Sequence, residues 1–86
     1  PTIPSTPTSF TRDLYPGMTG PDVTTLQRYL NTNGFIIAPA GPGSPGNETA
    51  YFGLATKAAL RKLQLANSIR STGNLGPVTR KFILTY

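Results

Sequence analysis

One short pattern occurs twice in the second half of this 86-residue chain, from Tyr51 to Leu60 and again from Asn74 to Ile83. Each copy has an apolar residue, a glycine, two variable residues, a threonine, a basic residue, a variable residue and two apolar residues. The glycine lets the chain turn sharply into a helix, and the threonine hydroxyl can bond backbone in the first turn or face outward. A repeated helix start predicts an all-α fold of short successive helices.

A fainter copy of the same start begins at Gly20. Pro21 suits the first position of a helix, and Gly34 suits the left-handed residue that follows the last turn. The apolar residues between them fall on one helical face, at Val23, Leu26 and Leu30. The sequence therefore predicts a first helix between residues 20 and 34.

Two further helices complete a small three-helix bundle. We expect the second from about Leu54 to Asn67, and the third to be opened by Pro77. Residues 38–50 contain three prolines and three glycines, which predicts a long Gly/Pro-rich loop between the first two helices. The predicted core consists of Val23, Leu26, Leu30, Phe35, Phe52, Ala59, Leu60, Leu63, Ile69, Leu75, Val78 and Phe82, with Ile83 as a further contact.

The chain divides into a tail and one domain. Residues 1–9 are rich in Pro, Ser and Thr and carry no charge, which predicts an extended linker, and residues 10–86 form the domain. There is no initiator Met, no signal segment and no apolar run of membrane-spanning length. We therefore expect a monomeric module from a larger multidomain protein, without membrane contact.

The residue inventory excludes most catalytic chemistry. The chain has no His and no Cys, so it lacks an imidazole base, a thiol nucleophile and the usual zinc ligands. The acids are Asp13, Asp22 and Glu48, too scattered to predict a pair of catalytic carboxylates. We expect a binding module that is not an enzyme and needs no metal or cofactor.

The order and spacing of these residues resemble the peptidoglycan-binding domain family, a three-helix cell-wall module of exported bacterial proteins. The resemblance covers about residues 12–84. The matching positions are Leu14, Gly17, Gly20, Val23, Leu26, Gln27 and Leu30, then Phe52, Gly53, Thr56, Ala59, Leu60, Leu63 and Gln64, and finally Gly73, Gly76 and Thr79. The resemblance implies a non-catalytic module that holds an attached domain on peptidoglycan, in the wall, the periplasm or the extracellular space.

Repeated helix starts can line a cleft with free backbone N–H groups, which suit carboxylates or carbonyl-rich ligands. The candidate ligand-binding residues, for stem peptide or glycan, are Tyr51, Gly53, Thr56, Gln64, Gly76 and Thr79. A structural interpretation stays open, in which Gln27 and Gln64 tie helices to loop backbone and the threonines bond within the fold.

Three departures from the family pattern bear on ligand contact, and one is Leu63-Gln64, where the second helix of the family usually has Phe-Gln. The family usually has an acidic residue at the positions of Thr49 and Thr72, and the 38–50 loop is longer than its commonest form.

The net charge is +5, and the second helix carries Lys57, Arg61 and Lys62. These residues form either a solvated face or a surface that attracts an anionic polymer, so nucleic acid or another polyanion is the alternative partner. The third helix offers Arg80 and Lys81 but no run of Asn, Gln or Ser that could recognise base edges, which leaves nucleic acid second.

Overall fold

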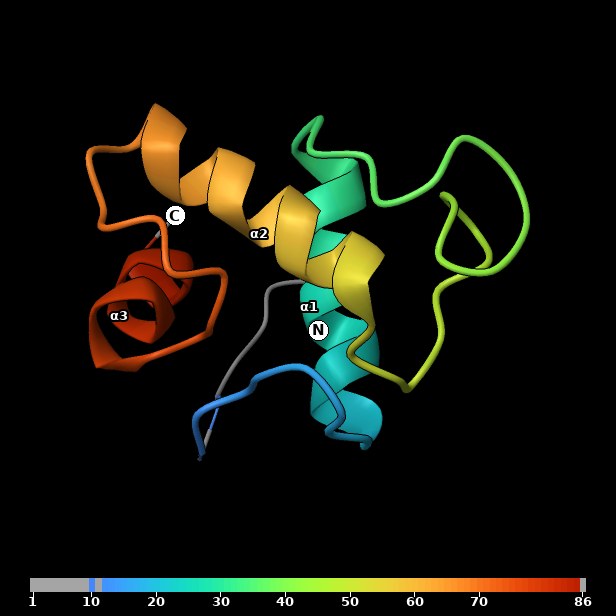
Figure 1. Cartoon of the computed structure of the whole chain (residues 1–86), viewed down its shortest axis with the longest axis horizontal. Helices are drawn as coiled ribbons and strands as arrows, with labels where there is room; N and C mark the ends of the chain where they lie inside the picture. The colour runs from blue at the N-terminus through green and yellow to red at the C-terminus, as the bar shows by residue number, and fades with distance from the viewer. Residues whose placement is uncertain (1–9, 11, 86) are drawn as a thin grey trace, which may run out of the picture.

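The computed structural model describes residue 10 and residues 12–85 and contains three helices, α1 (Pro21–Thr32), α2 (Leu54–Ala66) and α3 (Pro77–Thr85). In Figure 1, α2 crosses α1, and α3 lies beside the C-terminal half of α2. The described residues contain no regular strand, only two isolated bridges. The predicted all-α, three-helix architecture is confirmed, with Pro21 and Pro77 opening their helices as expected.

The core is built from the apolar stripe of each helix together with the segments that enter the helices. Its buried members are Phe10, Leu14, Val23, Leu26, Leu30, Phe52, Ala59, Leu60, Leu63, Leu75 and Ile83. Phe35 and Phe82 are partly buried against this core. Phe10 and Leu14 precede the first helix, in a stretch without periodicity, which is why the helical patterns did not predict them.

Two predicted core residues are wrong, because Ile69 is only partly buried and does not belong to the core cluster, and Val78 lies on the surface. Val78 is 67% exposed, whereas Ile83 is completely buried. The reason is the orientation of α3, in which the inward-facing Thr79 hydroxyl accepts a hydrogen bond from the Gln64 amide. Ile83 follows Thr79 by one helical turn and shares its inward face, while Val78 is rotated away by about 100°.

The segment before α1 joins the two repeated helix starts. Leu14 and Leu75 exchange both backbone hydrogen bonds, at 3.1 and 2.7 Å. The Phe52 N–H donates to the Met18 carbonyl, and the Gly17 N–H donates to the Phe52 carbonyl, both at 2.9 Å. The approaches to α2 and α3 are therefore fastened to one strand-like segment, and the two helix starts lie on the same side of the core.

Helices α1 and α2 end with the same backbone motif. The Phe35 N–H donates to the Leu30 carbonyl at 2.9 Å, and the Ile69 N–H donates to the Gln64 carbonyl at 2.8 Å. The residue before each donor is left-handed, Gly34 with φ 88° and Ser68 with φ 59°. These are Schellman motifs, which satisfy carbonyls of the last helical turn. Gly34 has the predicted conformation, and Ser68 is the one described non-glycine residue with positive φ.

The 38–50 loop projects away from the bundle (Figure 1) and is fastened at its base by Asn31. The Asn31 side-chain oxygen accepts from the Ile37 N–H, and its amide donates to the Gly43 carbonyl and to Glu48 Oε2. The predicted linker, residues 1–9, lies outside the described residues. Among the helices that the structure describes, none combines the length and the apolar character needed to cross a lipid bilayer.

Candidate functional site

The first glutamine cluster joins α1 to the start of α2 and consists of Gln27, Thr49, Tyr51 and Thr56. The buried Gln27 amide donates to the Tyr51 carbonyl at 2.9 Å and to Thr56 Oγ1 at 3.0 Å. Its side-chain oxygen accepts from the Thr49 N–H at 2.6 Å. One side chain therefore satisfies loop backbone and a buried hydroxyl together, which is favourable because an unpaired buried polar group is costly.

The second glutamine cluster joins α2 to the start of α3 and consists of Gln64, Gly73, Asn74 and Thr79. The Gln64 amide donates to the Asn74 carbonyl at 3.0 Å and to Thr79 Oγ1 at 3.1 Å. Its oxygen accepts from the Gly73 N–H at 2.9 Å. The sequence repeat is thus also a repeat of hydrogen bonding, in which each helix holds the start of the next.

Through these contacts Gln27 and Gln64 tie each helix to the backbone that precedes the next helix, which is the structural interpretation that the sequence left open. Gln64, Thr56 and Thr79 are each at most 3% exposed, and their polar atoms bond within the clusters. The predicted ligand-binding residues also divide into two groups, because Thr56 joins Gln27 whereas Thr79 joins Gln64. Ligand contact by these buried side chains remains a prediction.

Tyr51 is the exposed side chain of the predicted site. The residue is 55% exposed, and its ring lies over Gly53, where a Cβ would stand 3.2 Å from Tyr51 Cε2. Gly53 and Gly76 are both partly exposed, at the N-terminal ends of α2 and α3. The accessible part of the predicted site is therefore a tyrosine ring and two stretches of glycine backbone.

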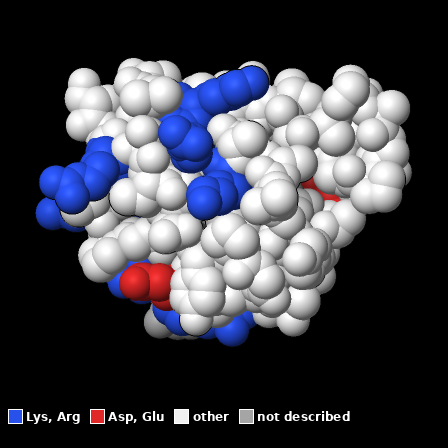
Figure 2. All heavy atoms as spheres, in the orientation of Figure 1, with Lys and Arg blue, Asp and Glu red and all other residues white. Residues whose placement is uncertain are grey.

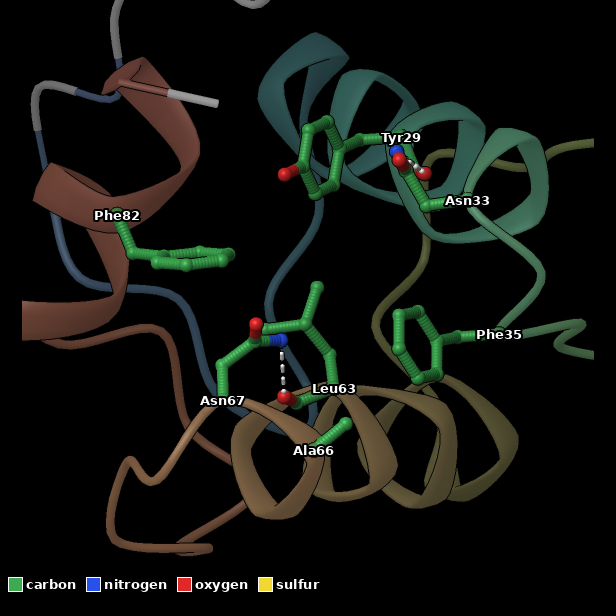
Figure 3. Close-up of a pocket in the computed structure, with 7 residues that line it drawn as sticks. All are labelled: Tyr29, Asn33, Phe35, Leu63, Ala66, Asn67 and Phe82. Atoms are coloured by element: carbon green, nitrogen blue, oxygen red, sulfur yellow. Dashed lines mark hydrogen bonds between the residues drawn. The ribbon is translucent and has the colours of Figure 1, made fainter.

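A groove that the sequence did not predict lies where the C-terminal ends of α1 and α2 approach α3 (Figure 3). We call it the helix-end groove. It has a volume of about 550 Å³ and is lined by Tyr29, Asn33, Phe35, Leu63, Ala66, Asn67 and Phe82. Phe35 and Phe82 are residues of the predicted core, and no sequence pattern marks Tyr29 as a site residue. All three residues have a partly buried ring near a helix end. The three rings meet only because of the way the helices cross, which the sequence pattern does not specify.

The rims of the helix-end groove carry two equivalent asparagines, which cap α1 and α2. The Asn33 amide donates to the Tyr29 carbonyl at 2.7 Å, and the Asn67 amide donates to the Leu63 carbonyl at 2.8 Å. In Figure 3 the Asn67 side-chain oxygen points into the groove. Burial raises the pKa of Tyr29, so its phenol is neutral at ordinary pH. The lining is consequently aromatic and polar but uncharged.

The charged side chains are distributed unevenly. The three acids each pair with an arginine, as Arg12–Asp22, Arg28–Glu48 and Arg80–Asp13, at 2.9, 3.9 and 3.1 Å. The hydrogen bond from Arg12 lowers the pKa of Asp22. Helix α2 contains no acid, and Figure 2 shows blue Lys and Arg atoms gathered on the side of the molecule where α2 lies. We call Lys57, Arg61 and Lys62 the basic face.

A comparison with protein families matches residues 19–83 to the peptidoglycan binding domain family. The chain belongs to this family. The match includes α1 and α2 whole, both glutamine clusters and α3 as far as Ile83. A search of curated proteins gave no significant match.

Thr49 and Thr72 lie at the two positions where the family usually has an acidic residue. The Thr49 hydroxyl accepts from the Tyr51 N–H at 3.3 Å, and the Thr72 hydroxyl accepts from the Asn74 N–H at 3.1 Å. Both are turns in which a side-chain oxygen bonds the backbone two residues on, a geometry that Asp and Thr share. The fold therefore keeps the turn without the negative charge.

Proposed function

We propose that this domain is a non-catalytic module that binds peptidoglycan and holds an attached domain at the bacterial cell wall. The observation that carries the proposal is the family match over residues 19–83, which spans both glutamine clusters and nearly all of the helical bundle. The absence of His and Cys from the sequence supports a binding role over catalysis. Binding to an insoluble polymer raises the local concentration of whatever is attached, without any reaction of its own.

Within the predicted site, we propose that Tyr51 and the backbone at Gly53 and Gly76 contact the wall, with stem peptide as the first candidate. Helix N-termini carry partial positive charge, which favours carboxylates, and an exposed tyrosine ring offers apolar area and a hydroxyl. The buried Thr56, Gln64 and Thr79 act indirectly in this proposal, by holding the two helix starts in position.

The test is sedimentation of the purified domain with insoluble sacculi. Tyr51→Ala should weaken binding about fivefold to tenfold, or about 1 kcal/mol, since it removes one exposed ring. Tyr15→Ala is the matched control, because Tyr15 is a tyrosine of nearly equal exposure, 53%, outside the predicted site. Equal effects of the two changes would remove Tyr51 from the site, and release of soluble muropeptides by pure protein would contradict the non-catalytic role.

A second comparison separates the wall from a generic polyanion. The double change Arg61→Ala with Lys62→Ala removes part of the basic face, and its effect should be small and further reduced by salt. If sacculus binding instead disappears at high salt, follows only these two residues and is matched by binding to duplex DNA, the polyanion alternative replaces peptidoglycan.

A further inference from the structure

The helix-end groove is a concave surface to which neither the glutamine clusters nor the predicted site contributes a polar contact. Its walls come from three parts of the fold: the end of α1 with Phe35, the end of α2, and Phe82 of α3. In Figure 3 the three rings surround an open space above Leu63 and Asn67. Its size is within the range of small-molecule and sugar sites.

Charge restricts what this groove can bind. It lies at the C-terminal ends of α1 and α2, where aligned peptide dipoles leave partial negative charge. The lining contains no Lys or Arg to offset that charge. A carboxylate or phosphate is therefore disfavoured in the groove, and an uncharged ligand with N–H or O–H donors is favoured.

The hydrogen-bonding groups of the groove also favour a ligand that has N–H or O–H donors. The side-chain nitrogens of Asn33 and Asn67 donate hydrogen bonds to the Tyr29 and Leu63 carbonyls in the last turn of each helix. This bond uses one of the two N–H groups of each amide and leaves the side-chain oxygen as an acceptor, and the Asn67 oxygen points into the groove (Figure 3). An amide N–H on the ligand is the complementary group.

The rings complete the description of the ligand. Tyr29, Phe35 and Phe82 are partly buried, so each leaves some ring surface for a C–H face or a methyl group. A ligand that suits all these features has an amide N–H, a small apolar group beside it and no negative charge. An acetamido group attached to a sugar ring has this combination.

We infer that the helix-end groove binds an N-acetylated hexosamine of the wall glycan, with the acetamido N–H donated to an asparagine oxygen and the methyl group against the rings. This inference rests on the proposed function and assigns the glycan to the helix ends, at a distance from the predicted site at the helix starts. The stem peptide, with its carboxylates, is disfavoured in the groove by the helix dipoles.

The experiment uses a soluble tetramer of N-acetylglucosamine as the probe and follows backbone amide shifts by NMR. Cellotetraose is the control ligand, since it is neutral and of equal length but has no acetamido groups. The acetylated tetramer should shift amides of residues 29–35, 63–67 and 82, and cellotetraose should shift them at least fivefold less at equal concentration. Equal shifts with both sugars, or shifts confined to the basic face or the helix starts, would overturn the inference.

A pair of variants tests the ring contribution. Tyr29→Leu keeps an apolar side chain but removes the ring, and should weaken tetramer binding at least fivefold. Tyr15→Leu is the matched change outside the groove and should leave the affinity unchanged. If the spectrum of Tyr29→Leu shows an altered fold, Asn67→Ser, which removes the amide oxygen from an exposed position, provides the same test. Unchanged affinity in a folded variant contradicts the inference.

The same measurements distinguish failure of this inference from failure of the proposed function. If the domain sediments with sacculi but a soluble stem peptide, not the acetylated tetramer, shifts the groove amides, the inference is wrong and peptidoglycan binding stands. If the tetramer binds in the groove and sacculi are not bound, the sugar site stands and the anchoring function fails.

Discussion

The two glutamine clusters close connections of very different length with nearly the same hydrogen bonds. The connection from α1 to α2 comprises residues 33–53, about twice the length of residues 67–76 between α2 and α3. In both, a buried glutamine donates to one loop carbonyl and one threonine hydroxyl of the following helix. The start of each helix is therefore specified by the preceding helix, and a longer loop can be inserted between the two without altering that start.

The longer connection needs a second point of attachment. Asn31 supplies it, by bonding to Ile37, Gly43 and Glu48 around the base of the projecting loop. The shorter connection has no counterpart to Asn31 within residues 67–76, where the Schellman motif at Ser68 leads almost directly to Gly73. Loop closure costs only about 0.6 kcal/mol for each doubling of length, so a single anchored asparagine is enough to offset the difference.

The two clusters also differ at one backbone position. Gly73 has φ +79°, and a Cβ there would lie 2.5 Å from Lys57 Cγ. In the repeat, Ala50 occupies the equivalent place and is not among the residues with positive φ. The second copy therefore depends on glycine where the first does not, because the stems of Lys57 and Arg61 cross the chain at Gly73.

The largest predicted effect comes from removing either glutamine. Gln27→Leu and Gln64→Leu keep the side-chain volume but leave a loop carbonyl and a buried hydroxyl without their donor. Each should cost about 2–3 kcal/mol and lower the Tm by roughly 10–20 °C. We expect Gln27→Leu to cost slightly more, because it releases the longer connection.

Thermal unfolding followed by circular dichroism measures this pair, with the exposed change Leu65→Gln on α2 as a control that should alter the Tm by little. A loss below about 0.5 kcal/mol for either glutamine would show that its bonds are not needed to hold the connection.

Next in size is the difference between Gly73 and Ala50. Gly73→Ala forces a side chain into a left-handed conformation and against Lys57, and should cost about 1–2 kcal/mol. Ala50→Gly is the reciprocal change and should cost about 0.5–1 kcal/mol or less, since it only adds freedom to the unfolded chain. Urea denaturation gives both values, and equal losses would mean that the two copies have the same backbone requirement.

A smaller effect compares the two helix ends. Ser68→Gly relieves a non-glycine residue at φ 59° and should stabilise the domain by about 0.5–1 kcal/mol, or several degrees in Tm. Gly34→Ala imposes the same penalty on the end of α1 and should destabilise it by a similar amount. Changes of the same sign in these two variants would contradict the equivalence of the two Schellman motifs.

The smallest effect is a dependence on pH that only the longer connection has. The hydrogen bond from Asn31 is the main cause that lowers the pKa of Glu48 below its usual value. Because the pKa of this carboxyl is lower in the folded than in the unfolded state, its charged form stabilises the fold at pH values above the unfolded-state pKa. This contribution is lost as the pH falls through the folded-state pKa. Glu48→Gln should therefore lower the Tm slightly at pH 7 and change it less at pH 3.

Residues 67–76 contain no acid, so the second connection should show no such dependence. Amide exchange at Ile37 and Gly46, compared with Leu75 between pH 7 and pH 4, measures the two connections in one sample. Equal loss of protection at Leu75 would assign the pH effect to the whole domain, where the Arg12–Asp22 pair also contributes.

The sequence alone determined the number, order and starts of the helices, since these depend on local features. Proline and glycine restrict or free the backbone at helix ends, and an apolar stripe of helical period defines a buried face. It also determined the family, because its glycines, threonines and glutamines lie at specific spacings. This spacing identified Thr56, Gln64 and Thr79 as positions of the family pattern, but it did not predict whether their side chains are buried or exposed.

What those residues contact depends on the tertiary structure. Val78 and Ile83 are both apolar residues of α3, and the bond between Thr79 and Gln64 determines which of them faces the core. The helix-end groove is decided in the same way, since Tyr29, Asn67 and Phe82 are far apart in the chain and meet only because α1, α2 and α3 cross there. Helical period specifies a face, but the neighbour of that face depends on packing between distant segments, which no local pattern contains.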